Sequence, residues 1–199
     1  REEQSRILAQ MADETVSIVS LTITEKGYCH HDGKIDLAHP DIAHDIANPD
    51  DPVSAPGYIV AALAMRRDAG IAPFTCLSCD NLSDNGRLLA HVVGEIAERV
   101  DPELAAWIKT EVRFPVTMID RIVPATTDAD LALVATIIGH KDFAPVIHEP
   151  FSQWVIEDSF GALGRPDFDA VGAQMVADVA PFESMKLRCL NGSHTALAI

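Results

Sequence analysis

Four polar side chains near the end of the chain have the types and the spacing that acid–base chemistry requires. They lie within the stretch 181–198, which we expect to be helical, with Pro181 in its first turn and Gly192 as a weak point. At about 100° per residue the four fall within an arc of roughly 140°, so they share one face of the helix. The set is Glu183, Lys186, Asn191 and His194.

The same face carries leucines that should pack inward. Leu187, Leu190 and Leu197 alternate with the polar residues. A buried polar group without a partner costs about 1–3 kcal/mol, and a buried ammonium costs more. We therefore expect the polar side chains to line a cleft rather than a closed core.

Each side chain would have a distinct capacity in such a cleft. Desolvation disfavours the ammonium form of a lysine, so Lys186 could accept an alcohol proton as a general base. Asn191 offers amide donors to a developing alkoxide, and His194 could hold a neighbouring hydroxyl. A structural alternative is that Lys186 extends to solvent while Asn191 and His194 are satisfied core residues. Glu183 would then only favour the first helical turn.

The preceding sequence follows the rhythm of an α/β fold, in which parallel strands present ligands at their carboxyl ends. Asn81 directly follows the second expected strand, in the turn-rich loop 80–86. The expected elements are a short helix over 2–11, a strand buried on both faces over 16–23, a helix over 56–70 closed by Gly70, a buried strand over 74–79, helices over 87–100 and 128–138, a strand over 151–156 and a loop over 161–167.

Composition excludes several classes of partner. Thirty acidic against fifteen basic residues give a net charge of −15, which repels nucleic acid and anionic membrane surfaces. No apolar run approaches the ~20 residues of a membrane span, and residues 1–6 lack a signal-peptide pattern, so we expect a cytoplasmic protein. Four cysteines do not make a disulfide framework, and we expect thiols.

The stretch KLRCLNGSH, residues 186–194, resembles the KxxxxNxxH signature of the mannitol dehydrogenase family, which includes fructuronate reductases and arabinitol dehydrogenases. Further similar segments occur in the family's order, so the resemblance covers essentially the whole chain. They are TEKGY at 24–28, LSCDNL at 77–82 followed by NG at 85–86, FP at 114–115, MIDRI at 118–122 and EPFSQWV at 149–155.

The resemblance implies a metal-independent transfer of hydride between NAD or NADP and a small polyol or sugar acid. Lys186 would be the general base, and Asn81 and Asn191 would donate hydrogen bonds to the reacting oxygen. His194 would orient the substrate.

Three further roles follow from the same resemblance. Asp120 would hold a substrate hydroxyl, Glu183 would lie on the proton path between the lysine and solvent, and Glu25 would lie near the cofactor. One position departs from the family's pattern. Val116 stands where many relatives have asparagine or another small polar residue, which puts local substrate contacts in doubt.

The resemblance also implies the domain organisation. Residues 1–180 would be the later part of a Rossmann-like parallel-sheet domain, and residues 181–199 would begin an all-helical substrate domain. The sequence has no GxGxxG fingerprint and runs to residue 199 in an expected helix, so we expect both ends to be cuts.

Two alternatives stay open. A zinc alcohol dehydrogenase would need metal ligands, for which Cys76 with Cys79, and Cys29 with His30 and His31, are the candidates. The first pair would point to opposite faces of a strand. The second alternative is an inactive fragment or binding module of the same fold. The sequence does not distinguish NAD from NADP, one polyol or sugar acid from another, or one oligomeric state from another.

Overall fold

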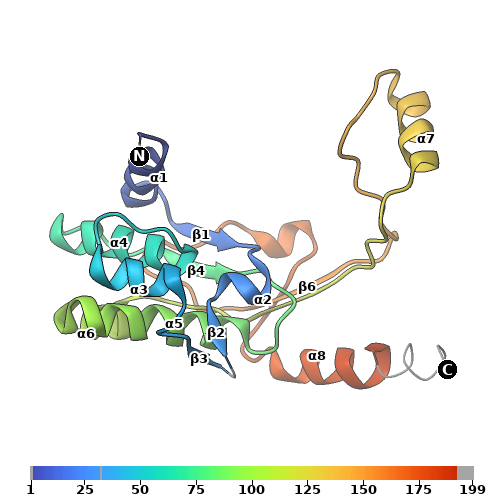
Figure 1. Ribbon diagram of the computed structural model, residues 1–199. Coiled ribbons are helices and arrows are strands. Elements are labelled where there is room, and N and C mark those ends of the chain that lie inside the picture. Colours follow the sequence, from blue (N-terminus) through green and yellow to red (C-terminus); the bar gives the residue numbers. More distant parts are fainter. Residues whose placement is uncertain (1, 32, 192–199) are drawn as a thin grey trace.

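A parallel pair of strands forms the centre of the molecule. The computed structural model describes residues 2–31 and 33–191, and the side chains of 3–31 and 33–189. Strands β1 (Ile18–Leu21) and β4 (Thr75–Ser78) pair in parallel, from Ile18 opposite Thr75 to Leu21 opposite Ser78 (Figure 1). The expected parallel arrangement is confirmed.

The burial expected for the first strand is wrong in part. β4 is buried throughout, but in β1 only Leu21 is buried and Ser20 is exposed. Among the described residues β1 pairs with β4 alone, so one edge of β1 has no neighbouring strand. Burial on the faces of a strand depends on the layers packed over the sheet, and in β1 these layers bury Leu21 but leave Ser20 exposed.

Helices cover this pair and form most of the core. Figure 1 shows α3, α4, α5 and α6 gathered beside it, and α1 packs on α4. The crossover helix α4 begins after Ser54, whose hydroxyl accepts a hydrogen bond from the N–H of Gly57 at 3.0 Å, and the chain turns at Gly70 with φ of +68°. The helices are α1 (Glu2–Ala12), α2 (Thr24–Gly27), α3 (Pro40–Ala47), α4 (Ala55–Asp68), α5 (Asn85–Val100) and α6 (Pro102–Glu111).

A second group of strands extends the central layer. β6 pairs antiparallel with β5 and parallel with β7, and the segment before β5 lies against β4, where the N–H of Cys76 donates to the carbonyl of Arg113 at 2.9 Å. The two strand groups are thus joined. The remaining elements up to residue 176 are β2 (His30–His31), β3 (Lys34–Ile35), β5 (Thr117–Asp120), β6 (Gln153–Glu157), the 3₁₀ turn η1 (Phe168–Val171) and β7 (Gln174–Val176).

Residues 121–152 form an arm that leaves the body between β5 and β6. The arm carries α7 (Asp128–Ile138), and Figure 1 shows this helix well apart from the other elements. No residue of α7 is buried, and Ile137, Phe143 and Val146 are 72%, 80% and 67% exposed. The arm therefore contributes little to the core.

The C-terminal helix departs from the expected geometry. α8 (Ala180–Met185) is α-helical, but Lys186–Asn191, labelled η2, is a π-helix. A π-helix has i→i+5 hydrogen bonds, so the projection at 100° per residue fails beyond Lys186. The prediction that Leu187 packs inward is wrong, because 51% of it is exposed.

No helix in the described part of the chain is both long enough and apolar enough to cross a membrane.

Candidate active site

The ammonium of Lys186 lies among oxygen atoms from two other parts of the chain. Its Nζ donates hydrogen bonds to Oδ1 of Asn81 at 2.9 Å and to the carbonyl of Ile119, and it lies 3.9 Å from Oδ1 of Asp120. Its side chain is 10% exposed. The structural alternative in which Lys186 extends to solvent does not describe this arrangement.

The ends of two strands supply these partners. Asn81 follows β4, and Ile119 and Asp120 close β5, where Asp120 pairs with Gln153 of β6. Because Oδ1 of Asn81 accepts from the lysine, its Nδ2 is the group that could meet a substrate oxygen. The structure thus brings Lys186, Asn81 and Asp120 together from three distant stretches of sequence.

Asn85 ties the two strand ends to each other. This residue is fully buried, its Oδ1 accepts from the N–H of Thr117 at 3.0 Å, and its Nδ2 lies 2.9 Å from the carbonyl of Asp80 and 3.1 Å from that of Thr117. At the neighbouring position 86 there is room only for glycine, because a Cβ there would lie 2.5 Å from the carbonyl oxygens of Phe114 and Pro115. These contacts give the Asn85–Gly86 motif a packing reason.

Glu183 shares a cavity with the lysine but has a different hydrogen-bond partner. Its Oε1 accepts from the N–H of Asp84 at 2.9 Å. The cavity measures about 110 Å³ and is lined by Asp80, Asn81, Leu82, Ser83, Thr117, Met118, Ile119, Glu183, Lys186 and Leu187. The position of Glu183 on this wall is compatible with a proton path, and that role stays a prediction.

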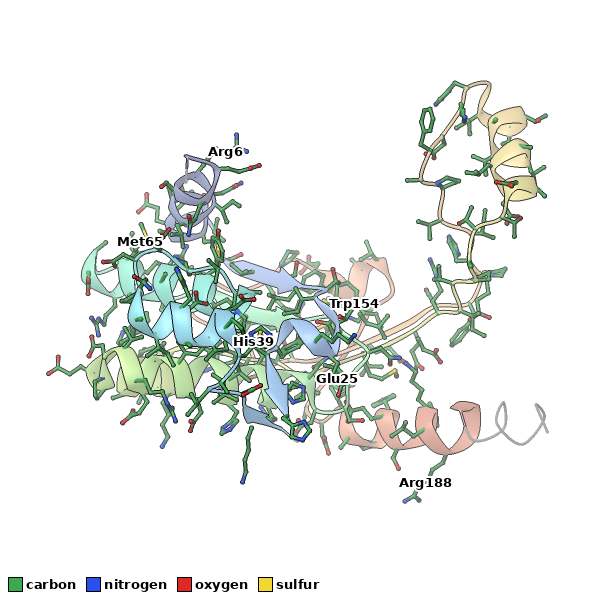
Figure 2. All side chains as sticks on the ribbon, in the orientation of Figure 1. Arg6, Glu25, His39, Met65, Trp154 and Arg188 are labelled. Carbon is green, nitrogen blue, oxygen red and sulfur yellow. The ribbon has the colours of Figure 1, made fainter. Side chains whose placement is uncertain are left out.

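The other expected site residues are less closely joined. Glu25 is exposed on α2, the turn that follows β1 (Figure 2). The side chain of Asn191, and the whole of His194, lie outside the described residues, so their expected roles stay predictions. Arg188 points away from the body, as Figure 2 shows.

Val116 does not line the lysine cavity. It is 6% exposed and packs in a small apolar cluster with Met118, Val155 and Val179. The apolar residue at this position therefore serves the core. It packs with Met118, which lines the lysine cavity, so its effect on local substrate contacts stays a prediction.

Sequence reasoning missed a set of buried polar residues beneath Asn81. They are Tyr28, Ser78, Asp80 and Asn85, all at most 7% exposed. Burial, opposed by the hydrogen bond from Ser78 and reinforced by Asp80, raises the pKa of Tyr28 well above its usual range, so the phenol keeps its proton. Three of the four occur in the segments TEKGY and LSCDNL, and this was the available signal.

In the described part of the chain Cys29, Cys76 and Cys79 are thiols, and none of the three is fully exposed. Burial raises the pKa of Cys76, and burial together with the charge of Asp80 raises that of Cys79 to about 11. Both thiols therefore keep their protons near neutral pH.

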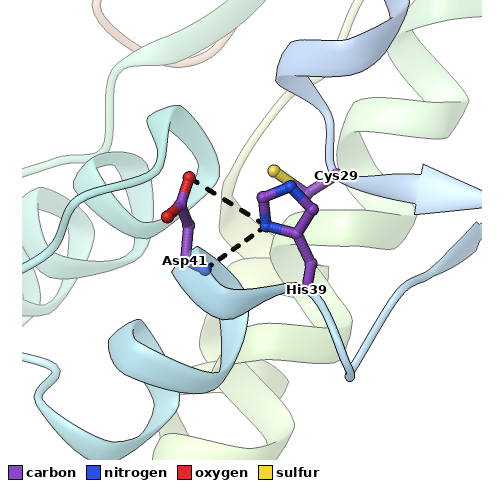
Figure 3. Close-up of side chains that lie close together, drawn as sticks. All are labelled: Cys29, His39 and Asp41. Atoms are coloured by element: carbon purple, nitrogen blue, oxygen red, sulfur yellow. Dashed lines mark hydrogen bonds and ion pairs between the residues drawn. The ribbon is translucent and has the colours of Figure 1, made fainter.

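One group of potential metal ligands occurs in the described part of the chain. Ligand atoms of Cys29, His39 and Asp41 lie within 4.8 Å of one another (Figure 3). Nδ1 of His39 already accepts the N–H of Asp41 at 3.3 Å as the cap of α3, and a cation there would face the positive end of that helix. We therefore assign His39 and Asp41 to helix capping.

Comparison with known proteins places this geometry in context. The family model described as the mannitol dehydrogenase Rossmann domain matches residues 1–170. D-mannonate oxidoreductase of Escherichia coli (strain K12) is 55% identical over 194 residues, covering 96% of this chain and 40% of the relative. Mannitol 2-dehydrogenase of Cereibacter sphaeroides is 47% identical over 197 residues, covering 98% and 41%.

A solved structure agrees with the fold. The Pseudomonas fluorescens mannitol 2-dehydrogenase ternary complex with NAD and D-mannitol superposes with a TM-score of 0.89 at 45% identity, covering 97% of this chain and 39% of that one. The chain thus spans about two fifths of the length of each of these proteins.

Proposed function

The chain belongs to the mannitol dehydrogenase family, and on that premise we propose that it is the central part of an oxidoreductase acting on a polyol or sugar acid. The enzyme would move a hydride between NAD or NADP and a secondary alcohol carbon, with a lysine rather than a metal handling the proton. The names of the relatives support this substrate class, because they refer to mannonate and mannitol.

The contact between Lys186 and Asn81 is the observation that carries the proposal. The two residues are 105 positions apart, and a proton carrier meets a polar amide at the carboxyl end of a central parallel strand. Ligands of open α/β sheets bind at such ends. The π-helix that begins at Lys186 supports the same view, since these irregular turns are frequent at functional sites.

Nicotinamide fits the same edge of the sheet. β1 and β4 are parallel neighbours, so α2 with Glu25 and the loop with Asn81 follow strand ends that lie side by side. We assign the nicotinamide half of the cofactor to this edge and its phosphates to residues outside this chain. When bound, the cofactor would accept or return the hydride.

The chain's own residues would control the proton and the oxygen. In alcohol oxidation, the neutral amine of Lys186 would take the proton of the hydroxyl group, and the carbon that bears this hydroxyl would give its hydride to the nicotinamide. In the reverse direction the ammonium of Lys186 would return the proton to the oxygen. Nδ2 of Asn81, together with Asn191, would donate to the oxygen as negative charge develops. Asp120 would hold a neighbouring hydroxyl, and His194 would orient the substrate.

The size of the cavity fits the reacting end of such a substrate. Ligand sites usually measure about 300–1,000 Å³, several times the volume beside Lys186. We propose that residues 1–180 belong to the Rossmann domain, that residues 181–199 begin a helical domain, and that this second domain supplies the remaining wall. The isolated 199 residues should then turn over little or no substrate.

The proposal is tested in the complete protein that contains this chain. Absorbance of reduced nicotinamide is followed with fructose, fructuronate and a panel of polyols, with and without a chelator. We expect chelator-resistant turnover of at least one of them, and loss of activity on chelation would instead favour the zinc alternative.

A substitution then tests the lysine. Lys186→Ala should lower kcat by about 10²–10⁴-fold, because general base catalysis typically contributes that much, and added amines should restore part of it. Lys109→Ala is the control, since Lys109 is exposed on α6. Unchanged kinetics in Lys186→Ala would refute the assignment.

A further inference from the structure

Asn81 is exposed, but the residues that hold it in place are buried. Asp80, which precedes it, is 7% exposed, and Ser78 is fully buried. A flexible loop could not hold an amide at a fixed distance from Lys186. The hydrogen bonds of Asp80 explain how this loop does so.

The carboxylate of Asp80 binds the turn that follows β1. Oδ1 accepts the backbone N–H of Thr24 at 2.7 Å. Oδ2 accepts the N–H of Ile23 at 3.1 Å and the hydroxyl of Tyr28 at 2.7 Å. The Tyr28 oxygen is also 2.5 Å from Oγ of Ser78, within β4 itself. Because the buried phenol stays protonated, it can serve as a donor to the carboxylate at every physiological pH.

The backbone of Asp80 is held from the opposite side. Its carbonyl accepts from Nδ2 of Asn85 at 2.9 Å, and Asn85 in turn is bonded to Thr117 of β5. Residue 80 is therefore fixed through its side chain to the segment 23–28 and through its carbonyl to β5. The next residue along the chain is Asn81.

We propose that Asp80 is a positioning residue that sets Asn81 against Lys186 and sets the turn carrying Glu25 beside them. The inference rests on the proposed function, because it gives Asn81 and Lys186 a shared task. Asp80 does not touch the ammonium through any described contact, and it acts through the loop and the turn that it joins. Support of this kind from behind the reacting groups keeps catalytic geometry within the narrow range that turnover needs.

The test compares two buried aspartates in the complete protein. Asp80→Asn leaves one oxygen acceptor and converts the other to a donor, so at least one of the three N–H or O–H donors loses its partner. Asp45→Asn is the matched control. Asp45 is 2% exposed and accepts from Val53 N at 2.7 Å, Ser54 N at 3.0 Å and the Ser54 hydroxyl, and it lines no part of the lysine cavity. Tyr28→Phe removes a single donor and serves as the milder variant.

Both aspartate variants should lose melting temperature, but only Asp80→Asn should lose catalysis beyond that. We expect kcat to fall about ten- to a hundredfold in Asp80→Asn, the size of effect that a misplacement of about 1 Å produces. The pH dependence of kcat should also change in Asp80→Asn. The limb of the kcat–pH profile that Lys186→Ala abolishes should lie at a different pH in Asp80→Asn. Tyr28→Phe should change kcat and the pH profile in the same direction as Asp80→Asn, but less strongly. Asp45→Asn should keep kcat within about twofold.

An equal fall in kcat for Asp80→Asn and Asp45→Asn, with an unmoved pH profile, would overturn the positioning role while leaving the proposed function intact. Retained activity in Lys186→Ala would instead count against the proposed function. A second measurement is the chemical shift of the Asn81 side-chain amide in nitrogen-15 spectra. This shift reports the surroundings of the Asn81 side chain independently of catalytic activity. It should change in Asp80→Asn and not in Asp45→Asn, and the same spectrum for both would also overturn the inference.

Discussion

Replacing Asn85 by aspartate should destabilise the fold in a pH-dependent way. The two side chains have nearly the same shape, so the exchange replaces two N–H donors with an acceptor. Nδ2 of Asn85 faces four acceptors, the carbonyls of Ser78, Asp80 and Thr117 and the hydroxyl of Thr117. An ionised carboxylate would place negative charge against all of them.

The magnitude follows from counting the bonds that can form. Two N–H hydrogens satisfy two of the four acceptors, and Oδ1 accepts one N–H. Asn85→Asp keeps the accepted bond and loses the two donated ones, at about 1–3 kcal/mol for each bond lost in this buried site. We expect the free energy of unfolding to fall by about 2–6 kcal/mol at pH 7.

The sign of the pH dependence is fixed by the same contacts. The folded state disfavours the ionised form, so the pKa of the introduced carboxyl should lie above its unfolded value of about 3.9. Between those two values the folded state binds more protons, and stability falls as pH rises. The protonated acid regains one donor, so the deficit relative to the unchanged protein should shrink by about 1–2 kcal/mol on going from pH 7 to pH 4.

Urea unfolding followed by tryptophan fluorescence at several pH values measures this deficit. Asn48→Asp is the control, because Asn48 is exposed at the end of α3 and its Nδ2 donates a single hydrogen bond to the carbonyl of His44. The reasoning would be refuted by equal losses in the two variants, or by a deficit for Asn85→Asp that shrinks as pH rises.

Two other predictions follow from packing and from burial. Gly86→Ala should lower the free energy of unfolding by about 3 kcal/mol or more in urea titrations, because the new Cβ would overlap two backbone oxygens. Gly94→Ala in the same helix is the control: its Cβ meets nothing within 4 Å, so it should raise the free energy of unfolding by up to about 1 kcal/mol. Equal effects of the two substitutions would contradict this packing. In thiol labelling of the folded protein at pH 8, the exposed Cys189 should react first and Cys76 only after unfolding. Labelling repeated at higher pH should modify Cys79 faster as the pH approaches about 11. Early modification of Cys76, read by mass spectrometry, would show that β4 is not buried.

Local signals made some elements predictable from sequence. The helix 128–138 has its expected bounds because Thr127 and Asp130 form a capping box and Gly139 ends the helix with φ of +78°. The strand before Asn81 could be found because an apolar run meets a turn-rich loop. Signals for α3 and α6 were present too, since Pro40 and Pro102 each follow a capping side chain, but these helices were not anticipated.

Other features depend on tertiary contacts that no local pattern contains. The π-helix at Lys186 breaks the regular spacing on which the shared face of Lys186, Asn191 and His194 was argued. The resemblance supplied Asn81 and Asp120, and the structure places both beside the lysine. Asp80 stood in a quoted motif without a role, because its three donors come from a turn more than fifty residues earlier.

The arm between β5 and β6 gives the protein a place where length can change freely during evolution. Its two ends are fixed by the antiparallel ladder, in which Asp120 lies opposite Gln153. Doubling the length of a loop closed in this way costs only about 0.6 kcal/mol. Insertions and deletions in residues 121–152 could therefore accumulate without moving the carbonyl of Ile119, which receives the hydrogen bond of Lys186. We expect homologous sequences to differ most in length there and least between Asp80 and Gly86.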